Sequence, residues 1–530
     1  MPEKVTITVD GRELSVDAGQ TILRAALDNG IDIPHFCYHP ALSIAGNCRI
    51  CVVEIEGAPK LQTSCSELVR DGMVVHTESK AVLRARAAVL EFLLINHPLD
   101  CSVCDKSGEC LLQDYTYEHR RFPGSPYIDS RMELPKIVPA TKELGSKIWI
   151  WANRCIHCSR CVRFCDEIAG TGELTFVNRG AHAEIDCHPG RPLDNSIALN
   201  VVDLCPVGAL LDKESLYKSR VWFLDGRDSV CPHCSAGCNI RIESSSNRIK
   251  RIRPRPNSQV NSYWICDFGR HNFDYFDRDD RIARPELRRN GGLEEAPRLE
   301  ALERIAERLR ALPGGKLAGI GSAQSTCEDN YALRLLVEQL GGTTFALRET
   351  RRGSAEKFPA FEIEAEKAPN SRGALAALGL ERLGTDELCL QIEAGEIAGA
   401  VALGNELDVP LGGRERAALG KLEFLLVIDS WRSDLAEAAH ALLPAANFSE
   451  KDGTFVNSAG RVQRIHQCLV PEGGQAASEW IWLKRISDAL GGDWDFDGPA
   501  GLFDLLAASN GAFAGISYES LGELGQPMKG

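Results

Sequence analysis

The stretch NHPLDCSVCDKSGECLLQD, residues 96–114, contains three cysteines at a spacing typical of ligands of a four-iron cluster. These cysteines are Cys101, Cys104 and Cys110. Such a cluster takes four protein ligands, so one position is left for another kind of residue. His97 lies four residues before Cys101, and an imidazole nitrogen is a known iron ligand. The local pattern therefore makes His97 the candidate for the fourth ligand.

The segment before these cysteines predicts how His97 is presented. Residues 79–98, SKAVLRARAAVLEFLLINHP, have the apolar spacing of an amphipathic helix. Because proline cannot continue a helix, this helix should end near Asn96, before Pro98. We therefore expect His97 at a helix end, facing the cysteine loop.

The length, net charge and apolar stretches of the chain limit the classes of protein to which it can belong. With 530 residues the chain is too long for one compact core, and several domains are expected. A net charge of −14 argues against a general nucleic-acid binder, which needs a basic surface. We find no apolar stretch of roughly 18 residues, so any membrane association should come through partners. The first residues already have a strand-like pattern, and we expect no signal peptide.

The twenty cysteines are the most informative part of the composition. Seventeen lie before residue 267 and only three after it. Close Cys-x-x-Cys spacings in a chain without an export signal indicate metal ligation rather than disulfides. We therefore expect metal sites in the first half of the chain.

A first group of cysteines follows a predicted hairpin and helix. Residues 5–16, VTITVDGRELSV, alternate apolar and polar side chains around an Asp-Gly turn, which predicts a β-hairpin. Residues 21–31, TILRAALDNGI, form one apolar helical face, with Gly30 at the expected helix end. The cysteines that come next are Cys37, Cys48, Cys51 and Cys65.

This order of elements resembles a plant-type [2Fe–2S] ferredoxin. The plant-type spacing begins C-x4-C, whereas ten residues separate Cys37 from Cys48. The longer spacing resembles the variant at the start of the large iron–sulfur subunit of respiratory complex I, and residues 96–114 resemble the His-plus-three-Cys site of that subunit. A zinc ribbon is the alternative, although zinc sites favour two matched short Cys pairs.

A third group combines CIHCSRCVRFC, residues 155–165, with DLCPVGAL, residues 203–210. Three cysteines at C-x2-C-x2-C with a remote Cys-Pro predict one [4Fe–4S] cluster. The expected ligands are Cys155, Cys158, Cys161 and Cys205. Cys165 and Cys187 are interpreted as spare, because Asp166 replaces the proline that follows the extra cysteine in two-cluster ferredoxins.

A fourth group combines VCPHCSAGCNI, residues 230–240, with WICDFGR, residues 264–270. Its cysteines are Cys231, Cys234, Cys238 and Cys266. The spacing resembles the N-terminal [4Fe–4S] domain of molybdopterin oxidoreductases such as formate dehydrogenases. The connecting residues 239–258 are strand-like, and their basic run is interpreted as a solvated hairpin face. The remaining Cys327, Cys389 and Cys468 are expected to be buried free thiols.

From about residue 290 the pattern changes to helices alternating with short apolar runs, which predicts a doubly wound α/β domain. Residues 433–443, SDLAEAAHALL, are predicted to be helical. Residues 442–465 resemble the closing segment of the large domain in molybdopterin oxidoreductases and complex I large subunits. Molybdopterin enzymes commonly carry a lysine two residues after the last cluster cysteine, and Phe268 stands there in this chain. A shortened domain without a cofactor is therefore favoured over a molybdenum catalyst.

The motifs together place the chain near the large iron–sulfur subunit of respiratory complex I and the related subunits of NAD-linked hydrogenases, formate dehydrogenases and benzoyl-CoA reductase complexes. The resemblance implies an α+β multidomain chain: a β-grasp [2Fe–2S] domain, helical and ferredoxin-like [4Fe–4S] domains, and a shortened α/β molybdopterin-oxidoreductase-like domain. The corresponding boundaries are 1–80, 81–135, 136–222, 223–285 and 286–530.

By this resemblance the chain is expected to relay single electrons through one [2Fe–2S] and three [4Fe–4S] clusters, with no molybdopterin and no active site of its own. Implied partners are an NADH-oxidising flavoprotein with FMN, a small thioredoxin-like [2Fe–2S] subunit and a downstream acceptor subunit. The expected location is the cytoplasm. The alternative function is a molybdopterin-dependent catalytic subunit similar to formate dehydrogenase.

Overall fold

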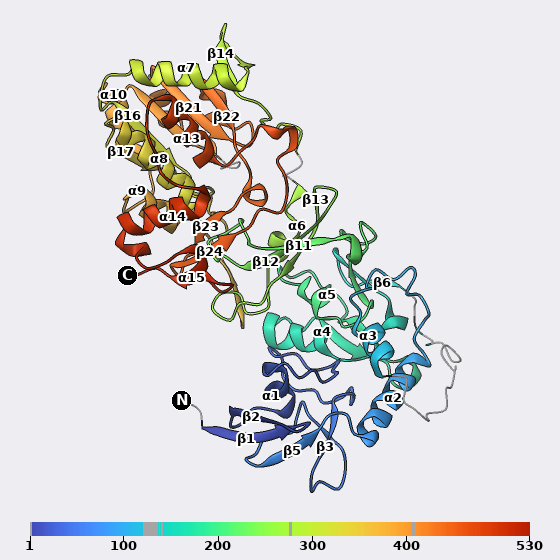
Figure 1. The fold of residues 1–530 in the computed structure, drawn as a ribbon. Coiled ribbons are helices and arrows are strands. Elements are labelled where there is room, and N and C mark those ends of the chain that lie inside the picture. Colours follow the sequence, from blue (N-terminus) through green and yellow to red (C-terminus); the bar gives the residue numbers. More distant parts are fainter. Residues whose placement is uncertain are drawn as a thin grey trace. The chain divides into compact units, whose positions relative to one another are not determined.

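The computed structural model describes residues 3–119, 136, 138, 141–274, 278–404 and 409–529. The chain forms two compact units (Figure 1). The first comprises residues 1–224 and 358–361, and the second comprises residues 225–357 and 362–530. The predicted domain boundary at residue 135 lies outside the described residues. Among the described helices, none combines the length and apolar composition needed to span a bilayer.

The first unit begins with a mixed five-stranded sheet and one helix. The elements are β1 (Lys4–Val9), β2 (Arg12–Asp17), α1 (Ile22–Asp28), β3 (Val52–Ile55), β4 (Gln62–Thr63) and β5 (Met73–His76), and the strand order is β2-β1-β5-β3-β4. The hairpin β1–β2 is confirmed, and its turn uses left-handed backbone at Asp10 (φ 47°) and Gly11 (φ 81°). The helix is also confirmed, and its Leu23 shares a core with Ile7 of β1.

The other elements of the first unit frame the cysteine loops, and all of them except the 15-residue helix α2 are short. They are α2 (Lys80–Leu94), α3 (Leu111–His119), β6 (Lys142–Glu143), β7 (Ile148–Ile150), α4 (Arg160–Arg163), the π-helix η2 (Phe164–Ala169), β8 (Leu174–Val177), β9 (Glu184–Cys187), α5 (Asn200–Leu204) and β10 (Leu210–Asp212). The predicted helix before His97 is confirmed as α2, with Ile95 at its C-cap. Long loops between such short elements leave many backbone N–H groups free to turn towards a bound group.

The second unit begins with a three-stranded antiparallel sheet of β11 (Asp225–Val230), β12 (Asn239–Ser245) and β13 (Arg248–Pro254), followed by α6 (Asp267–His271). The basic run on β13 belongs to a hairpin, as predicted. Arg251 forms an ion pair with Glu243 on the neighbouring strand, and Arg255 lies 3.6 Å from Asp228. These contacts support the interpretation of a structural hairpin rather than a nucleic-acid site.

A seven-stranded sheet forms the centre of the second unit, in the order β15-β14-β22-β21-β20-β16-β17. Its strands are β14 (Glu286–Arg289), β15 (Gly292–Glu295), β16 (Leu317–Gly321), β17 (Thr344–Leu347), β20 (Gly399–Leu403), β21 (Phe424–Asp429) and β22 (Ala441–Pro444). The five strands from β22 to β17 are parallel. Parallel strands with nearly continuous burial require helices on both faces.

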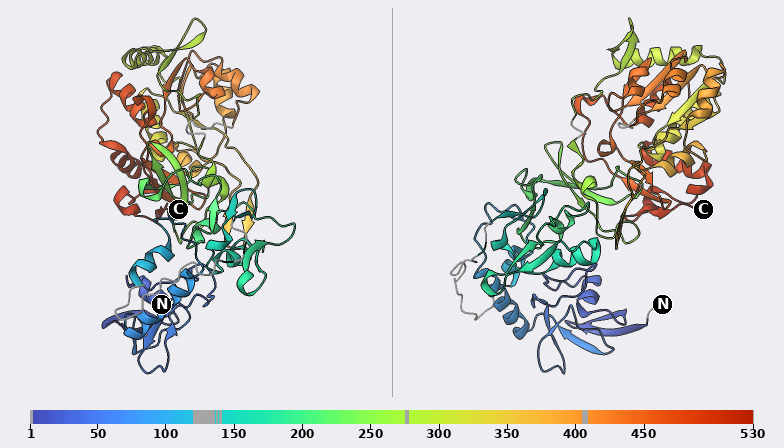
Figure 2. Two further views of the ribbon diagram at one scale, coloured as in Figure 1. Left: turned by 90° about the vertical axis from the view of Figure 1, so that its right-hand side faces the viewer. Right: turned by 180° about the vertical axis from the view of Figure 1, so that it is seen from behind.

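Alternate residues of the central strands enter two separate cores. Leu426 of β21 belongs to one core and the adjacent Val427 to the other, and each core also contains side chains from several helices. Figure 2 shows helices on both sides of this sheet, so the predicted doubly wound arrangement is confirmed. The helices are α7 (Arg298–Ala311), α8 (Cys327–Gln339), α9 (Ser371–Leu378), α10 (Asp386–Glu393), α11 (Gly413–Leu419), α12 (Asp434–Ala438), α13 (Glu479–Ala489), α14 (Gly498–Ser509) and α15 (Tyr518–Leu521).

The predicted helix over residues 433–443 is wrong in its second half. Helix α12 ends at Ala438, and Ala441–Pro444 form the fully buried strand β22 between β21 and β14. Alanine and leucine favour a helix locally, but the sheet offers this segment backbone partners on both sides, and tertiary context overrides the propensity.

The remaining strands are β18 (Glu356–Phe358), β19 (Phe361–Ile363), β23 (Gly453–Val456), β24 (Arg461–Ile465) and β25 (Gln526–Pro527). A buried ion cluster holds the start of β23 against two helices. Lys451 lies 2.9 Å from Asp329 of α8 and 2.6 Å from Glu479 of α13, and all three side chains are at most 2% exposed. Glu328 accepts hydrogen bonds from the backbone and hydroxyl of Thr454. Burial, and then the nearby Asp329, raises the pKa of Glu479 to about 7.

Replacing Lys451 with methionine is expected to destabilise the second unit by about 3–5 kcal/mol near pH 8, because two buried carboxylates lose their cation. Native-state hydrogen exchange at the β23 amides would measure the loss. The pKa of Glu479 should rise further without the lysine. A folded-state pKa above the unfolded value favours the folded state as pH falls, so the loss should shrink between pH 8 and pH 5.

The matched control is Lys421→Met, since Lys421 is exposed on the same unit. We expect a change within about 0.5 kcal/mol for this variant. Equal effects of the two substitutions, or a loss at Lys451 that grows towards low pH, would contradict the role given to the buried ion cluster.

Candidate iron–sulfur sites

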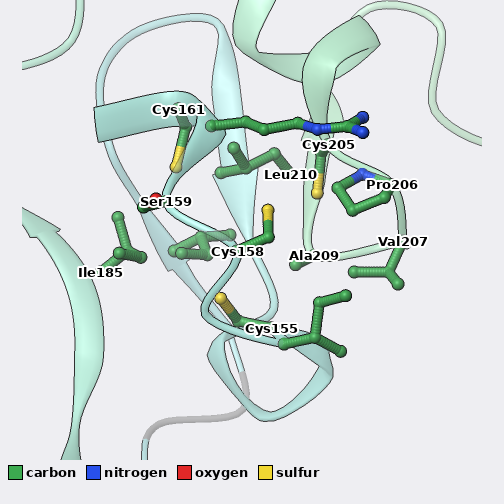
Figure 3. A pocket seen from close by; sticks show the side chains of 13 residues that line it. Cys155, Cys158, Ser159, Cys161, Ile185, Cys205, Pro206, Val207, Ala209 and Leu210 are labelled. Carbon is green, nitrogen blue, oxygen red and sulfur yellow. The ribbon is translucent and has the colours of Figure 1, made fainter. Parts of the chain in front are cut away.

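The third cysteine group surrounds one small cavity in the first unit. Cys155 and Cys158 come from the loop that leads into α4, Cys161 lies in α4 itself, and Cys205 is the C-cap residue of α5. Figure 3 shows their four sulfur atoms around this cavity. The rest of the lining is mainly apolar: Ile150, Ile156, Ile185, Val207 and Leu210. The structure therefore brings together all four residues that the spacing predicted.

The loop uses unusual backbone conformations to surround the cavity. His157 (φ 53°) and Ser159 (φ 65°) both adopt left-handed backbone between the cysteines. The His157 N–H group points at the Cys155 sulfur, at an N···S distance of 3.4 Å. Non-glycine residues rarely take this conformation, and such residues concentrate at binding sites. Hydrogen bonds of this kind stabilise a thiolate and adjust the potential of a cluster.

Burial of the third group favours its neutral thiols. It raises the pKa of Cys155 to about 11 and of Cys158 to about 12, and each sulfur further disfavours ionisation of the next. A bound metal reverses this balance, because its positive charge deprotonates a coordinating thiol. Within the described ranges, no three His, Cys, Asp or Glu side chains are grouped as ligands of a single ion would be. Ligands spread around a cavity fit a multi-iron group better than one zinc ion.

The first cysteine group is also assembled by the fold. The sulfur of Cys37 lies within hydrogen-bond distance of the Cys48 and Cys65 sulfurs, and that of Cys51 contacts Cys65. The Cys37 N–H group donates to the Cys48 sulfur at 3.5 Å. Hydrogen bonds from Cys48 and Cys65 hold the pKa of Cys37 well below its usual range. Three of the four side chains are buried, and Cys48 is half-buried. The donor set is therefore four converging sulfurs, as a [2Fe–2S] cluster requires.

The second group is less enclosed. Cys101 is exposed, whereas Cys104 and Cys110 are half-buried. His97 follows the end of α2, and its N–H group donates to Leu94 O at 3.2 Å. Burial lowers the pKa of His97 to about 4, helped by Lys136 and Arg154, so the imidazole is neutral at pH 7. A neutral imidazole keeps a nitrogen lone pair for a metal.

The second and third groups are packed against each other within the first unit. Arg154, directly before Cys155, donates to Asp100, directly before Cys101, at 3.1 and 3.0 Å. A Cβ atom placed on Gly208 would lie 2.2 Å from the Cys104 sulfur. The Cys104 side chain therefore occupies the space in which any residue other than glycine at position 208 would place its Cβ atom.

The fourth group lies in the second unit. The Cys231 N–H group donates to Cys238 O at 2.9 Å, which closes the loop between β11 and β12. Cys266 is the N-cap residue of α6, and its sulfur accepts from Gly269 N at 3.3 Å. A Cβ atom on Gly269 would lie 3.1 Å from the Cys231 sulfur and 3.4 Å from that of Cys266. Burial raises the pKa of Cys266 to about 11.

The remaining cysteines carry no disulfide. Cys165 is buried in the π-helix η2, and the Cys187 thiol donates to Leu144 O at 3.0 Å. Cys327 and Cys389 are buried, as expected for free thiols, whereas Cys468 is only half-buried. The structure also shows residues around the sites that the cysteine spacing did not predict, namely Arg154, Arg160, Arg163, Gly208 and Arg220. The first four lie within three residues of a cysteine of the groups, whereas Arg220, whose guanidinium donates to Cys104 O at 2.7 Å, carries no such sequence signal.

Several segments of this chain are similar to known protein families. Family models match residues 2–80 ("2Fe-2S iron-sulfur cluster binding domain"), 86–121 ("NADH-ubiquinone oxidoreductase-G iron-sulfur binding region"), 145–211 ("NADH-quinone oxidoreductase subunit 3, ferredoxin-like domain"), 227–278 ("Molybdopterin oxidoreductase Fe4S4 domain") and 368–489 ("Molybdopterin oxidoreductase").

Three individual relatives illustrate the similarity. An NADH-quinone oxidoreductase subunit of Rickettsia conorii is 40% identical over 345 residues, which is 65% of this chain and 50% of the relative. The mitochondrial NADH-ubiquinone oxidoreductase 78 kDa subunit of Candida albicans is 39% identical over 64% of this chain and 46% of the relative. A solved NAD+-reducing [NiFe]-hydrogenase is 32% identical with a TM-score of 0.33, over 41% of this chain and 90% of that one. The chain spans about half the length of the curated relatives it matches.

The close approach at Gly208 provides a test of the second site. In Gly208→Ala the new Cβ atom would overlap the Cys104 sulfur and displace it, while the backbone conformation stays accessible to alanine. We expect anaerobically purified protein to lose about four iron atoms per chain, the content of one [4Fe–4S] cluster. Iron analysis and the spectrum of the reduced protein would measure this.

Gly314→Ala is the control, because a Cβ atom at Gly314 meets no atom within 4 Å. Its iron content should equal that of the unmodified chain. Full iron content in Gly208→Ala would show that Cys104 holds no cluster at this position.

Proposed function

We propose that this chain, a relative of NADH-quinone and NADH-ubiquinone oxidoreductase subunits, is an electron-relay subunit of an NADH-linked multi-subunit oxidoreductase. One observation carries the proposal: each of four iron–sulfur family models falls on one of the four cysteine groups. A chain with one cluster could be a catalyst or a regulator. Four clusters in one chain are best explained by transfer of electrons between partner proteins.

The proposed ligands follow the predicted groups. A [2Fe–2S] cluster is assigned to Cys37, Cys48, Cys51 and Cys65. Three [4Fe–4S] clusters are assigned to His97 with Cys101, Cys104 and Cys110, to Cys155, Cys158, Cys161 and Cys205, and to Cys231, Cys234, Cys238 and Cys266. We further propose the domain limits 1–80, 81–135, 136–222, 223–285 and 286–530, with a β-grasp fold for the first.

When bound, such clusters accept and release one electron at a time. The chain's own residues determine how easily this happens. The His157 and Gly269 N–H groups point at ligand sulfurs, apolar side chains exclude water from the third site, and arginines supply positive charge. Each of these contacts stabilises the extra negative charge of a reduced cluster or limits its hydration.

The proposed partners are a flavoprotein that takes hydride from NADH with FMN, a small thioredoxin-like [2Fe–2S] subunit, and a subunit that accepts the electrons. The assembly would be cytoplasmic, with any membrane contact made through partners. Under this proposal no residue of the chain acts as a nucleophile or general base, and the chain has no activity alone.

The alternative is a molybdopterin-dependent catalytic subunit, and the match of residues 368–489 to molybdopterin oxidoreductases favours it. Two observations support the relay instead. Asp267 and Phe268 follow Cys266, where a lysine would be expected two residues on. In addition, buried polar side chains beside β23 bond to one another, since Lys451 donates to Asp329 and Glu479.

Metal analysis of the anaerobically purified full chain separates the candidate functions. A relay with one [2Fe–2S] and three [4Fe–4S] clusters should contain about fourteen iron atoms, without molybdenum or tungsten. A stoichiometric amount of either heavy metal would establish the alternative. Colourless protein that contains zinc and shows no paramagnetic signal on reduction would instead indicate an interaction scaffold.

Replacing His97 with cysteine tests the second ligand set. An additional thiolate adds negative charge to the cluster, so its midpoint potential should fall. Any pH dependence contributed by the distal imidazole nitrogen should disappear as well. Redox titration followed by electron paramagnetic resonance would measure both effects. An unchanged potential and spectrum would remove His97 from the ligand set, and His76→Cys, on the half-buried face of β5, serves as the control.

A further inference from the structure

Two arginines of the short helix α4 reach from the third cysteine group to the first. Arg160 lines the third cavity, and its guanidinium donates to Leu204 O at 3.3 Å and to Tyr38 O at 2.5 Å. Leu204 directly precedes Cys205, and Tyr38 directly follows Cys37. The side chain is only 7% exposed. One buried cation is therefore bonded next to a proposed ligand of each cluster.

Arg163 makes the more direct connection. Its Nη2 atom donates to the carbonyl oxygen of Cys37 at 2.5 Å and to that of Cys158 at 3.5 Å. Its Nη1 atom donates to Ser43 O in the first cysteine loop, and its Nε atom donates to the Ser159 hydroxyl at 3.1 Å. A continuous path of covalent and hydrogen bonds thus runs from the Cys158 sulfur through the guanidinium to the Cys37 sulfur.

Further contacts fix this arrangement. The backbone N–H and the hydroxyl group of Ser43 both donate to Glu167, at 2.8 and 2.5 Å, and the Asn47 amide donates to His157 O at 3.0 Å. The first and third loops are consequently held together at several points. Replacement of one arginine would leave these other bonds in place.

The charge of the two arginines is directed at the sites. The oxygens that accept from the two guanidinium groups belong to backbone carbonyls and one hydroxyl, so these bonds do not place a carboxylate against either guanidinium. Arg160 lines the cavity that the third group surrounds, and it also bonds to Tyr38 O beside Cys37 of the first group. In a poorly hydrated region a positive charge near a cluster favours its reduced form.

We propose that Arg160 and Arg163 couple the first and third clusters, by raising the reduction potential of both and by providing the bonded path between them. The inference rests on the proposed function. The step concerned moves one electron from a reduced cluster to an oxidised one and forms or breaks no bond. The arginines are positioning residues, since they act through the ligand loops and touch no reacting atom.

The test uses the full chain with its clusters, titrated between dithionite and a mild oxidant and followed by electron paramagnetic resonance. In Arg163→Met we expect the midpoint potentials of the first and third clusters to shift downwards, while those of the second and fourth stay unchanged. Arg163→Lys keeps the charge and should keep the potentials. It should nevertheless slow electron equilibration between the two clusters after rapid reduction, because lysine cannot bond all four oxygens.

Arg191→Met is the matched control, because Arg191 is exposed and its guanidinium donates to Thr171 O rather than to a residue of the cysteine groups. Its potentials should equal those of the unmodified chain. If the Arg163→Met protein loses iron, the measurement is repeated with Arg163→Gln. Glutamine is uncharged, but its amide can still donate a hydrogen bond to one of the carbonyl oxygens.

The outcomes separate this inference from the proposed function. Absence of cluster signals in the unmodified chain would refute the relay itself. Normal clusters whose first and third potentials do not respond to loss of the Arg163 charge would overturn only the coupling. Loss of iron from both neutral variants would also overturn it, because Arg163 would then be a structural clamp.

Discussion

A buried sulfur anion needs a compensating positive charge, and the organisation of this chain depends on that constraint. The third site shows it most clearly. Its sulfurs lie among isoleucine, valine and leucine side chains, and burial raises the pKa of the Cys155 and Cys158 thiols. Bound iron would supply most of the missing charge. The remainder can come from backbone N–H groups and from arginines placed on neighbouring loops, which explains why so many of these arginines bond to carbonyls beside cysteines.

The second unit also buries negative charges, and there a lysine compensates them. Three carboxylates, from Glu328, Asp329 and Glu479, are fully buried near one lysine and the hydroxyl of Tyr518. This network joins β23 to helices on the same face of the large sheet. The charged groups of this network are thus bonded to one another and to neighbouring groups of the same unit.

The sequence alone predicted the features that depend on local spacing. These include the hairpin β1–β2, the helices α1 and α2, the alternation of the large domain, and the four cysteine groups, whose members all lie in loops or at element ends. It failed where partners come from distant segments. Strand β22 was predicted as helix because its alanines and leucines favour one, and only its neighbours β14 and β21 make it a strand. The contacts of Arg163 with Cys37 and of Gly208 with Cys104 join residues that are far apart in the chain, so no periodicity reveals them.

The contact at Gly208 also bears on how the protein matures. Cys104 reaches its position only by resting on the backbone that follows Cys205, and Leu111 N, just after Cys110, donates to Pro206 O at 3.0 Å. The chain emerging from the ribosome contains the second cysteine group well before residue 205 is made. Under the proposed function, the second site therefore cannot take its final form until the later segment has been synthesised and has folded back. We expect its cluster to be inserted only after the residues of the third group have been synthesised, although its own cysteines come earlier in the sequence.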